Sequence, residues 1–196
     1  GAWVYFNMLE GLLTLDEKMQ VKPALATSYE VMSPTKVRFK LRPNVKFHDG
    51  TPFNAEAVRF TYDRALNGKP PARWASLAGS LAGAEVVDNL TVDIVTKEPY
   101  GPILRTLAMY CMGIVSPTAV GKLGADFSRA PVGTGPFKFV EWKTNTHVII
   151  ERHNDYWGDK ALVDRVIFKV VPEEAARMLA LQTGHADMVL FPAPAQ

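Results

Sequence analysis

The segment Lys36–Arg42 constrains the fold more than any other stretch of the chain. Three apolar residues alternate in it with four basic ones. Alternation with a period of two is typical of a β-strand that has one buried and one wet face. The turn signal Ser33-Pro34-Thr35 separates it from a second strand-like segment, Thr27–Met32. The sequence therefore predicts an antiparallel hairpin whose core-facing residues are Val37, Phe39 and Leu41.

Comparable local signals predict the other elements. Two further hairpins are expected, from Ala84–Asp88 with Thr91–Thr96 and from Phe137–Trp142 with His147–Arg152. Single strands are expected at Trp3–Asn7, Asp164–Val171 and Ala186–Leu190. Helices are expected at Ala55–Leu66 after the cap Asn54, from Pro102 to Met109, from Pro117 after the cap Ser116, and from Pro172 to Gln182. Many strands mixed with about four helices indicate an α/β or α+β protein.

Charge and hydropathy argue against nucleic-acid binding and against a membrane-spanning helix. Lys and Arg number 22 and Asp and Glu number 20, a net charge of +2, and the basic residues are scattered. This balance gives no indication of nucleic-acid binding. The longest apolar stretch, Leu107–Val115, is far shorter than the roughly twenty residues that a membrane-spanning helix needs.

Motifs for catalysis, metals and cofactors are lacking. The four histidines have no i,i+4 pairing, and neither CxxC nor HExxH occurs. The single cysteine, Cys111, lies in an apolar run and is expected to be a buried structural thiol. The glycine-rich stretch Gly133-Thr134-Gly135-Pro136 has neither the lysine of a P-loop nor GxGxxG spacing. It is either a tight turn before a strand or a place where backbone approaches a ligand closely. We therefore expect no catalytic residues, no metal site and no cofactor.

Four segments together resemble one protein family. They are YFNMLEGLL with the residues that follow it to Val31, VRFKLRPNVKFHDGTPFNAEAVRFTYDRAL (37–66), PVGTGPFKFVEW (131–142) followed by RHNDYWG, and ARMLALQTGHADMV (176–189). In order and spacing they resemble family 5 of the extracytoplasmic solute-binding proteins, the peptide, nickel and opine class. These are capture subunits of bacterial ABC importers. KFHDGTPFNAEAV and VGTGPF are the most specific motifs, and the resemblance covers essentially the whole chain.

The resemblance implies an α/β, periplasmic-binding-protein-like II fold of which this chain forms most of the N-terminal lobe only. The second lobe is expected to be absent and a signal peptide to have been removed. Residues 1–11 and 165–196 are expected to form the hinge-bearing part of the lobe. Residues 12–164 are expected to form its smaller subdomain, a spacer and side wall.

Ligand contacts in this family come from loops at the mouth between the lobes. The matching positions are Asn7, Met8, Leu9, Glu10, Gly11, Trp74, Tyr110, Cys111, Met112, Thr134 and Gly135. For Trp74, packing in the core is an equally good interpretation. The pair His48-Asp49 could suggest catalysis in isolation, but we assign it, with Phe47, Gly50 and Phe53, to folding. Tyr156-Trp157 is interpreted as a packing corner.

The expected function is non-enzymatic capture of a short peptide or a glutathione-like molecule by closure of two lobes. The expected partners are that ligand and the membrane permease of an ABC importer, without nucleic acid, and the expected location is periplasmic, or extracytoplasmic with a lipid anchor. The scarcity of arginine near the predicted contacts argues against a metal chelate as the ligand. The alternative is an extracytoplasmic sensor or a chaperone-like interaction domain that reuses the fold. Apolar surface is expected at Tyr110–Val115 and at Leu190–Pro194, where a second lobe would pack or connect.

Overall fold

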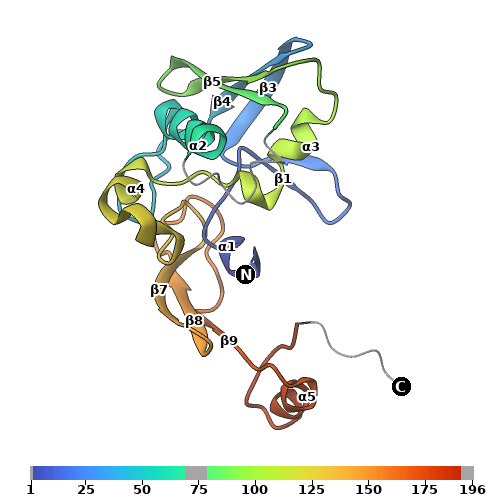
Figure 1. Cartoon of the computed structure of the whole chain (residues 1–196), viewed down its shortest axis with the longest axis vertical. Helices are drawn as coiled ribbons and strands as arrows, with labels where there is room; N and C mark the ends of the chain where they lie inside the picture. Colours follow the sequence, from blue (N-terminus) through green and yellow to red (C-terminus); the bar gives the residue numbers. More distant parts are fainter. Residues whose placement is uncertain (1, 69–78, 191–196) are drawn as a thin grey trace.

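The computed structural model describes residues 2–68 and 79–190, and in them two antiparallel sheets lie one beyond the other (Figure 1). The first sheet has the strand order β3-β4-β6-β5. Its strands are β3 (Ala26–Ser33), β4 (Lys36–Leu41), β5 (Leu81–Asp88) and β6 (Thr91–Thr96). The second sheet has the order β7-β8-β9, with β7 (Phe137–Lys143), β8 (His147–Arg152) and β9 (Arg165–Lys169). A short ribbon of β1 (Leu13–Leu15) and β2 (Val21–Pro23) adjoins the first sheet. The mixed α/β class predicted from the sequence is confirmed.

The hairpin predicted around Ser33-Pro34-Thr35 is present as β3 and β4. Val37, Phe39 and Leu41 are all buried, whereas the side chain of Arg38 is 32% exposed. The period-two argument is therefore confirmed in its polarity. The other two predicted hairpins are the pairs β5–β6 and β7–β8.

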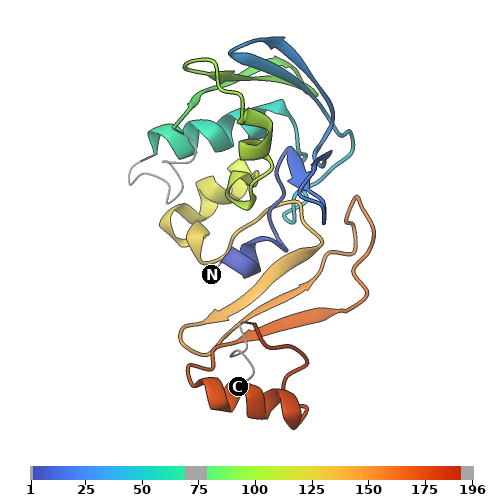
Figure 2. The ribbon, with the colours of Figure 1, turned by 90° about the vertical axis from the view of Figure 1, so that its right-hand side faces the viewer.

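Helices begin where the sequence places its caps. Helix α2 (Ala55–Asn67) begins after Asn54, whose side chain accepts a hydrogen bond from the Ala57 amide. Helix α4 (Pro117–Leu123) begins after Ser116, which accepts from the Ala119 amide. The remaining helical segments are α1 (Ala2–Tyr5), α3 (Ile103–Leu107), η1 (Tyr110–Met112), η2 (Gly124–Ser128) and α5 (Glu174–Gln182). Helix α2 packs along the first sheet, and α5 lies beyond the second sheet at the other end of the molecule (Figure 2).

Most of the apolar interior is divided between the two sheets, and a third, minor cluster of Val115, Ala119 and Phe127 packs α4 against η2. The larger cluster packs the first sheet against α2 and α3, and its most enclosed large side chains are Leu12, Leu25, Phe39, Phe47, Tyr62, Leu81, Ile94, Leu107 and Ile114. The smaller cluster joins Val4 and Met8 to Phe137 and Ile150 of the second sheet. The N-terminal residues are thus part of the core of a sheet that lies more than a hundred residues further along the chain.

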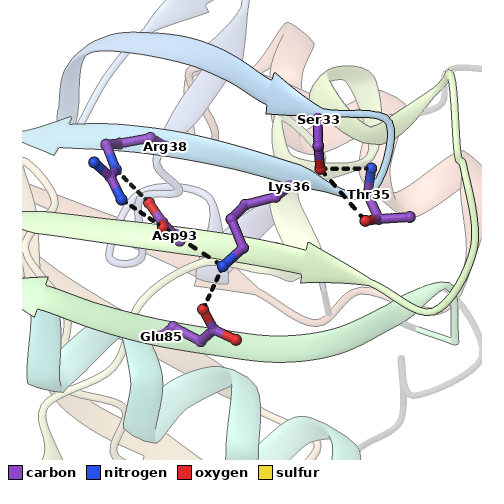
Figure 3. Close-up of polar contacts among 6 residues, drawn as sticks. All are labelled: Ser33, Thr35, Lys36, Arg38, Glu85 and Asp93. Atoms are coloured by element: carbon purple, nitrogen blue, oxygen red, sulfur yellow. Dashed lines mark hydrogen bonds and ion pairs between the residues drawn. The ribbon is translucent and has the colours of Figure 1, made fainter.

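A charged network covers the outer face of the first sheet (Figure 3). Asp93 of β6 accepts two hydrogen bonds from the Arg38 guanidinium, at 2.7 and 2.8 Å. Lys36 lies between Asp93 and Glu85, with its ammonium 2.7 Å from a Glu85 oxygen. Only 3% of the Asp93 side chain is exposed, and the hydrogen bonds from Arg38 lower the pKa of its carboxyl. The central strand β6 is therefore covered on both faces.

The prediction of a strand at Trp3–Asn7 is wrong. Residues 2–5 form α1, and the amides of Met8 and Leu9 donate to the Tyr5 carbonyl at 3.0 and 2.8 Å. Val4 and Met8 are four residues apart, so helical turns place them about 6 Å apart along the chain direction and both contact the second sheet. An extended chain would separate them by about 13 Å. The β-forming composition of the segment is outweighed by this packing.

The strand predicted at Ala186–Leu190 is also absent, and none of the described strands forms ladder hydrogen bonds with this segment. Gly184 ends α5 with a positive φ of 73°, and the amides of His185 and Ala186 both donate to the Ala180 carbonyl. The chain therefore turns back over the end of α5.

Exposed apolar surface lies elsewhere than most of the sequence analysis places it. Met112, Ile114 and Val115 are buried, so the prediction of an open face there is wrong. Leu190 is exposed, as predicted, and residues 191–196 lie outside the described part of the chain. Many of the exposed apolar side chains lie in or beside β9 and α5: Leu162, Val163, Ile167, Val170, Leu179 and Met188. Others, such as Val31 and Met19, lie elsewhere. Helix α5 has no buried residue. No helix in the described part of the chain is long and apolar enough to span a membrane.

Candidate functional site

Three loops meet between the two sheets and bring together most of the predicted ligand contacts. We call residues 7–11, 131–136 and 153–157 together the loop junction. The Gly135 amide donates to the Met8 carbonyl at 3.0 Å, and the Phe137 amide donates to the Asn7 carbonyl at 3.0 Å. The His153 amide donates to the Pro136 carbonyl at 2.8 Å. Segments that are far apart in the sequence are thus joined backbone to backbone.

The carboxylate of Glu10 is the polar centre of the loop junction. Thr134 and Trp157 donate to its Oε2 at 2.7 and 2.9 Å, and the Tyr156 hydroxyl donates to its Oε1 at 2.6 Å. Burial raises the pKa of Glu10, while these hydrogen bonds and the nearby guanidinium of Arg42 oppose that rise. The Arg42 guanidinium lies 4.2 Å from the centre of the Trp157 ring.

Histidine side chains hold the opposite side of the 131–136 loop. The Gly133 amide donates to Nδ1 of His48 at 3.3 Å, so Nε2 of His48 carries the proton and donates to the Gly135 carbonyl at 3.0 Å. His153 donates from Nδ1 to the same carbonyl at 3.3 Å, and the two rings meet edge to face with their centres 4.9 Å apart. Burial lowers the pKa of His48 to about 4 and also lowers that of His153. Both rings are therefore neutral at pH 7.

Glycine in this loop is required by close packing against the chain itself. A Cβ atom at Gly135 would lie 2.7 Å from the Asn7 carbonyl oxygen, and one at Gly133 would overlap the Met8 carbonyl oxygen. Gly135 does not have positive φ. Of the two interpretations left open by the sequence, the structure shows a tight turn before β7 whose close neighbour is the backbone of residues 7–9.

His48 and Asp49 both hydrogen-bond to other parts of the chain, although Asp49 is an exposed residue. Asp49 accepts from the Ser116 hydroxyl at 2.6 Å and from the Thr51 hydroxyl at 2.5 Å. Burial alone would raise the pKa of Asp49, but these hydrogen bonds hold it below its ordinary value. Phe47 and Phe53 pack edge to face beside them. This is the arrangement that the predicted folding role requires.

The predicted contact residues differ in how the structure treats them. Asn7, Met8, Leu9 and Glu10 contact the 131–136 loop, with Thr134 and Gly135 directly against them, whereas Gly11 lies against Leu107 and Leu13. Met112 lies close to Gly11, and Cys111 beside it is half-buried, with its thiol pKa raised by burial. Trp74 and the side chain of Tyr110 lie outside the described part of the structure.

Three of these side chains, Met8, Met112 and Thr134, are buried within the chain itself. Contact of any of the eleven residues with a ligand therefore stays a prediction. Sequence reasoning missed that Tyr156 and Trp157 reach Glu10, because partners 146 and 147 residues apart leave no local pattern.

A small open groove borders the histidine side of the loop junction. Its volume is about 170 Å³, and it is lined by Lys46, Phe47, His48, Gly50, Lys138, His153, Asn154 and Asp155. Its charged groups are two lysines and one aspartate, so it is weakly basic. In the described residues, no group of three or more His, Cys, Asp or Glu side chains could hold a metal ion.

Three known proteins that this chain resembles in sequence or structure are binding proteins. Glutathione-binding protein GsiB of Pectobacterium atrosepticum is 35% identical over 190 residues, which is 96% of this chain and 37% of that protein. The periplasmic binding protein DppA of Helicobacter pylori, solved with the peptide STSA, matches with a TM-score of 0.82 at 28% identity. That match covers 91% of this chain and 40% of DppA. AgaA of A. tumefaciens R10, solved with agropinic acid, matches with a TM-score of 0.87 at 30% identity, over 94% of this chain and 38% of AgaA.

The chain therefore spans less than half the length of these relatives. The family model for the middle region of bacterial extracellular solute-binding proteins, family 5, matches residues 20–196. Together with the shared fold, this match shows that the chain belongs to family 5 of the bacterial extracellular solute-binding proteins.

Proposed function

We propose that this chain is part of the first lobe of an extracytoplasmic receptor that captures short peptides or glutathione-like molecules for an ABC importer. The observation that carries the proposal is the family match over residues 20–196, with relatives named for glutathione and peptide binding. Capture needs lobe closure around a hinge and no chemical step. We propose accordingly that the protein is not an enzyme and that it delivers its ligand to a membrane permease.

The loop junction supports the idea that this lobe offers one rigid wall of the ligand cleft. Its backbone groups are fixed to one another by hydrogen bonds, and the Glu10 carboxylate, the His153 ring and the adjoining His48 ring have partners within the chain. A wall whose groups are already placed loses little conformational entropy when a ligand docks on it. We propose that the ligand meets the edge formed by residues 7–11 and 131–136, with Trp74 and Tyr110–Met112 beside it.

The class of ligand is proposed from the relatives. The protein that is 35% identical over nearly the whole chain is named for glutathione, a tripeptide-like molecule. The solved relative that holds a tetrapeptide is 28% identical. Short peptides and glutathione share backbone amides and carboxylates, so one set of polar groups in the cleft can serve both.

We also propose that residues 1–11 and 165–196 belong to the hinge-bearing part of the lobe and 12–164 to the smaller part. The apolar side chains exposed around β9 and α5 support this proposal, since such a surface is typically covered by another part of the protein. The cluster that joins Val4 and Met8 to Phe137 and Ile150 would then cross the boundary between the two parts.

Calorimetric titration tests the function. The 196-residue chain and the full-length protein that contains it are titrated with di- and tripeptides, glutathione and nickel chelates. Binding of glutathione or a short peptide to the full-length protein is expected, with far weaker binding by the chain alone, because one wall cannot enclose a small ligand. Equal affinities would contradict the two-wall cleft, binding of nickel chelates alone would contradict the ligand class, and turnover of a peptide would contradict the binding role.

A further inference from the structure

We infer that Glu10 is a positioning residue of the proposed binding wall, and that its carboxylate fixes the 131–136 loop by joining Thr134 to Tyr156 and Trp157. The consequence for ligand binding rests on the proposed function, whereas the linkage itself is a property of the folded chain. Among the predicted contact residues, Glu10 would thus act by holding Thr134, Tyr156 and Trp157 in place.

The geometry commits both carboxylate oxygens to the protein. Oε2 receives the Thr134 hydroxyl and the Trp157 indole N–H, and Oε1 receives the Tyr156 hydroxyl. All three distances are between 2.6 and 2.9 Å, which is typical of hydrogen bonds to a charged acceptor. The donors come from two different loops, so a single side chain from a third segment links them.

A carboxylate suits this position better than a neutral acceptor. Three donors converge on one side chain, and a carboxylate offers about four acceptor positions and no donor. Burial works against its charge, and the Arg42 guanidinium over the Trp157 ring supplies a compensating positive charge nearby. An apolar residue of the same size would leave the Trp157 indole N–H without its acceptor.

The loops that Glu10 joins also form the predicted edge of the wall. The Glu10 carbonyl accepts from the Ile114 amide at 2.8 Å, so its own backbone is fixed to the larger core. Thr134 lies between Gly133 and Gly135, whose backbone packs on residues 7–9. A loss of the carboxylate should therefore loosen the 131–136 and 153–157 loops, which keep their backbone hydrogen bonds, while leaving the first sheet unchanged.

Hydrogen exchange of the unliganded full-length protein tests the linkage. In Glu10→Leu, amides in 131–137 and 153–158 are expected to exchange at least tenfold faster, while those in β4 keep their wild-type rates. Glu10→Gln is expected to stay within about threefold of wild type. Its carbonyl oxygen can accept from Thr134 and Trp157, and its amide can donate to the Tyr156 oxygen. Thr134→Val removes one donor without touching the carboxylate and should give a smaller acceleration in the same two loops.

Three results would overturn the inference: unchanged exchange in Glu10→Leu, equal acceleration throughout the protein, or identical behaviour of Glu10→Leu and Glu10→Gln. If Glu10→Leu does not fold, the exchange rates of Thr134→Val in the same two loops are compared with those of wild type instead. A parallel titration with glutathione should show at least tenfold weaker binding in Glu10→Leu and near wild-type binding in Glu10→Gln. If wild type binds neither glutathione nor short peptides, the proposed function fails, and the exchange result still decides the linkage.

Discussion

Acid should destabilise the folded chain through one histidine, His48. Its ring lies against the 131–136 loop, with Nδ1 accepting from the Gly133 amide and Nε2 donating to the Gly135 carbonyl. A second proton would have to go on Nδ1, where it would face the Gly133 N–H. Burial therefore lowers the pKa of His48 from 6.5 to about 4, with hydrogen bonding to Gly135 opposing that fall and His153 adding to it.

The sign and size of the effect follow from linkage. Above pH 6.5 the imidazole is neutral in both folded and unfolded chains, so it adds nothing to the pH dependence. Between pH 6.5 and about 4 the unfolded chain binds the proton and the folded chain does not, so stability falls as the pH falls. The gap between the two pKa values corresponds to at most about 3 kcal/mol, because solvent reaches part of the ring.

Urea unfolding of wild type and of His48→Gln at several pH values from 7.5 to 4 measures this directly. Glutamine can still donate to the Gly135 carbonyl but leaves the Gly133 amide without its acceptor, so the variant should be about 1 kcal/mol less stable at pH 7.5. Wild type should then lose about 2–3 kcal/mol more than the variant by pH 4. The charged and titratable groups that act on the ring, His153, Lys138 and Asp49, are present in both proteins, as is Asp155, which acts on His153. Parallel pH profiles would refute the reasoning.

Three other substitutions test the packing. Gly135→Ala should lower the free energy of unfolding by about 1–3 kcal/mol, because the new Cβ meets the Asn7 carbonyl. Gly121→Ala, in open space within α4, should raise it by about 0.5–1 kcal/mol. Equal effects of the two substitutions in chemical denaturation would contradict this. Tyr62→Phe should stabilise by about 1 kcal/mol in the same assay, since the buried hydroxyl has no hydrogen-bond partner, and a loss would mean that it has one. Asp93→Ala should lower the free energy of unfolding by about 2–3 kcal/mol, because only 3% of the Asp93 side chain is exposed. Glu85→Ala should lower it by less than about 0.5 kcal/mol, because 61% of the Glu85 side chain is exposed. A larger loss in Glu85→Ala than in Asp93→Ala would contradict the argument.

Local patterns account for what the sequence predicted correctly. The alternation in Lys36–Arg42 and the caps at Asn54 and Ser116 each depend on contacts within a few residues, and all three are present in the structure. The hairpin of β7 and β8 in the second sheet likewise depends on residues that are close in the sequence. The short helix α1 was missed because four residues carry little periodicity, and its aromatic and β-branched composition favours a strand.

The loop junction could be predicted only in outline. The resemblance to family 5 brought residues 7–11 and 134–135 into one predicted site, and the structure places them side by side. The partners of Glu10 were not predictable, since the chain returns to it after 124 to 147 residues. The histidine side was missed for the same reason, because His48 and the loop it holds are 85 to 87 residues apart.

The smaller apolar cluster has a consequence for how the chain folds as it is made. Val4 and Met8 are synthesised before their partners Phe137 and Ile150, which follow about 130 to 150 residues later. At 5–20 residues per second, the N-terminal segment waits on the order of ten seconds for its core. Strands β7, β8 and β9 pair with sequence neighbours and need no such delay, whereas β6 must find β4 across an interval of about fifty to sixty residues. Val4 and Met8 are therefore buried only after a much later part of the chain has been made.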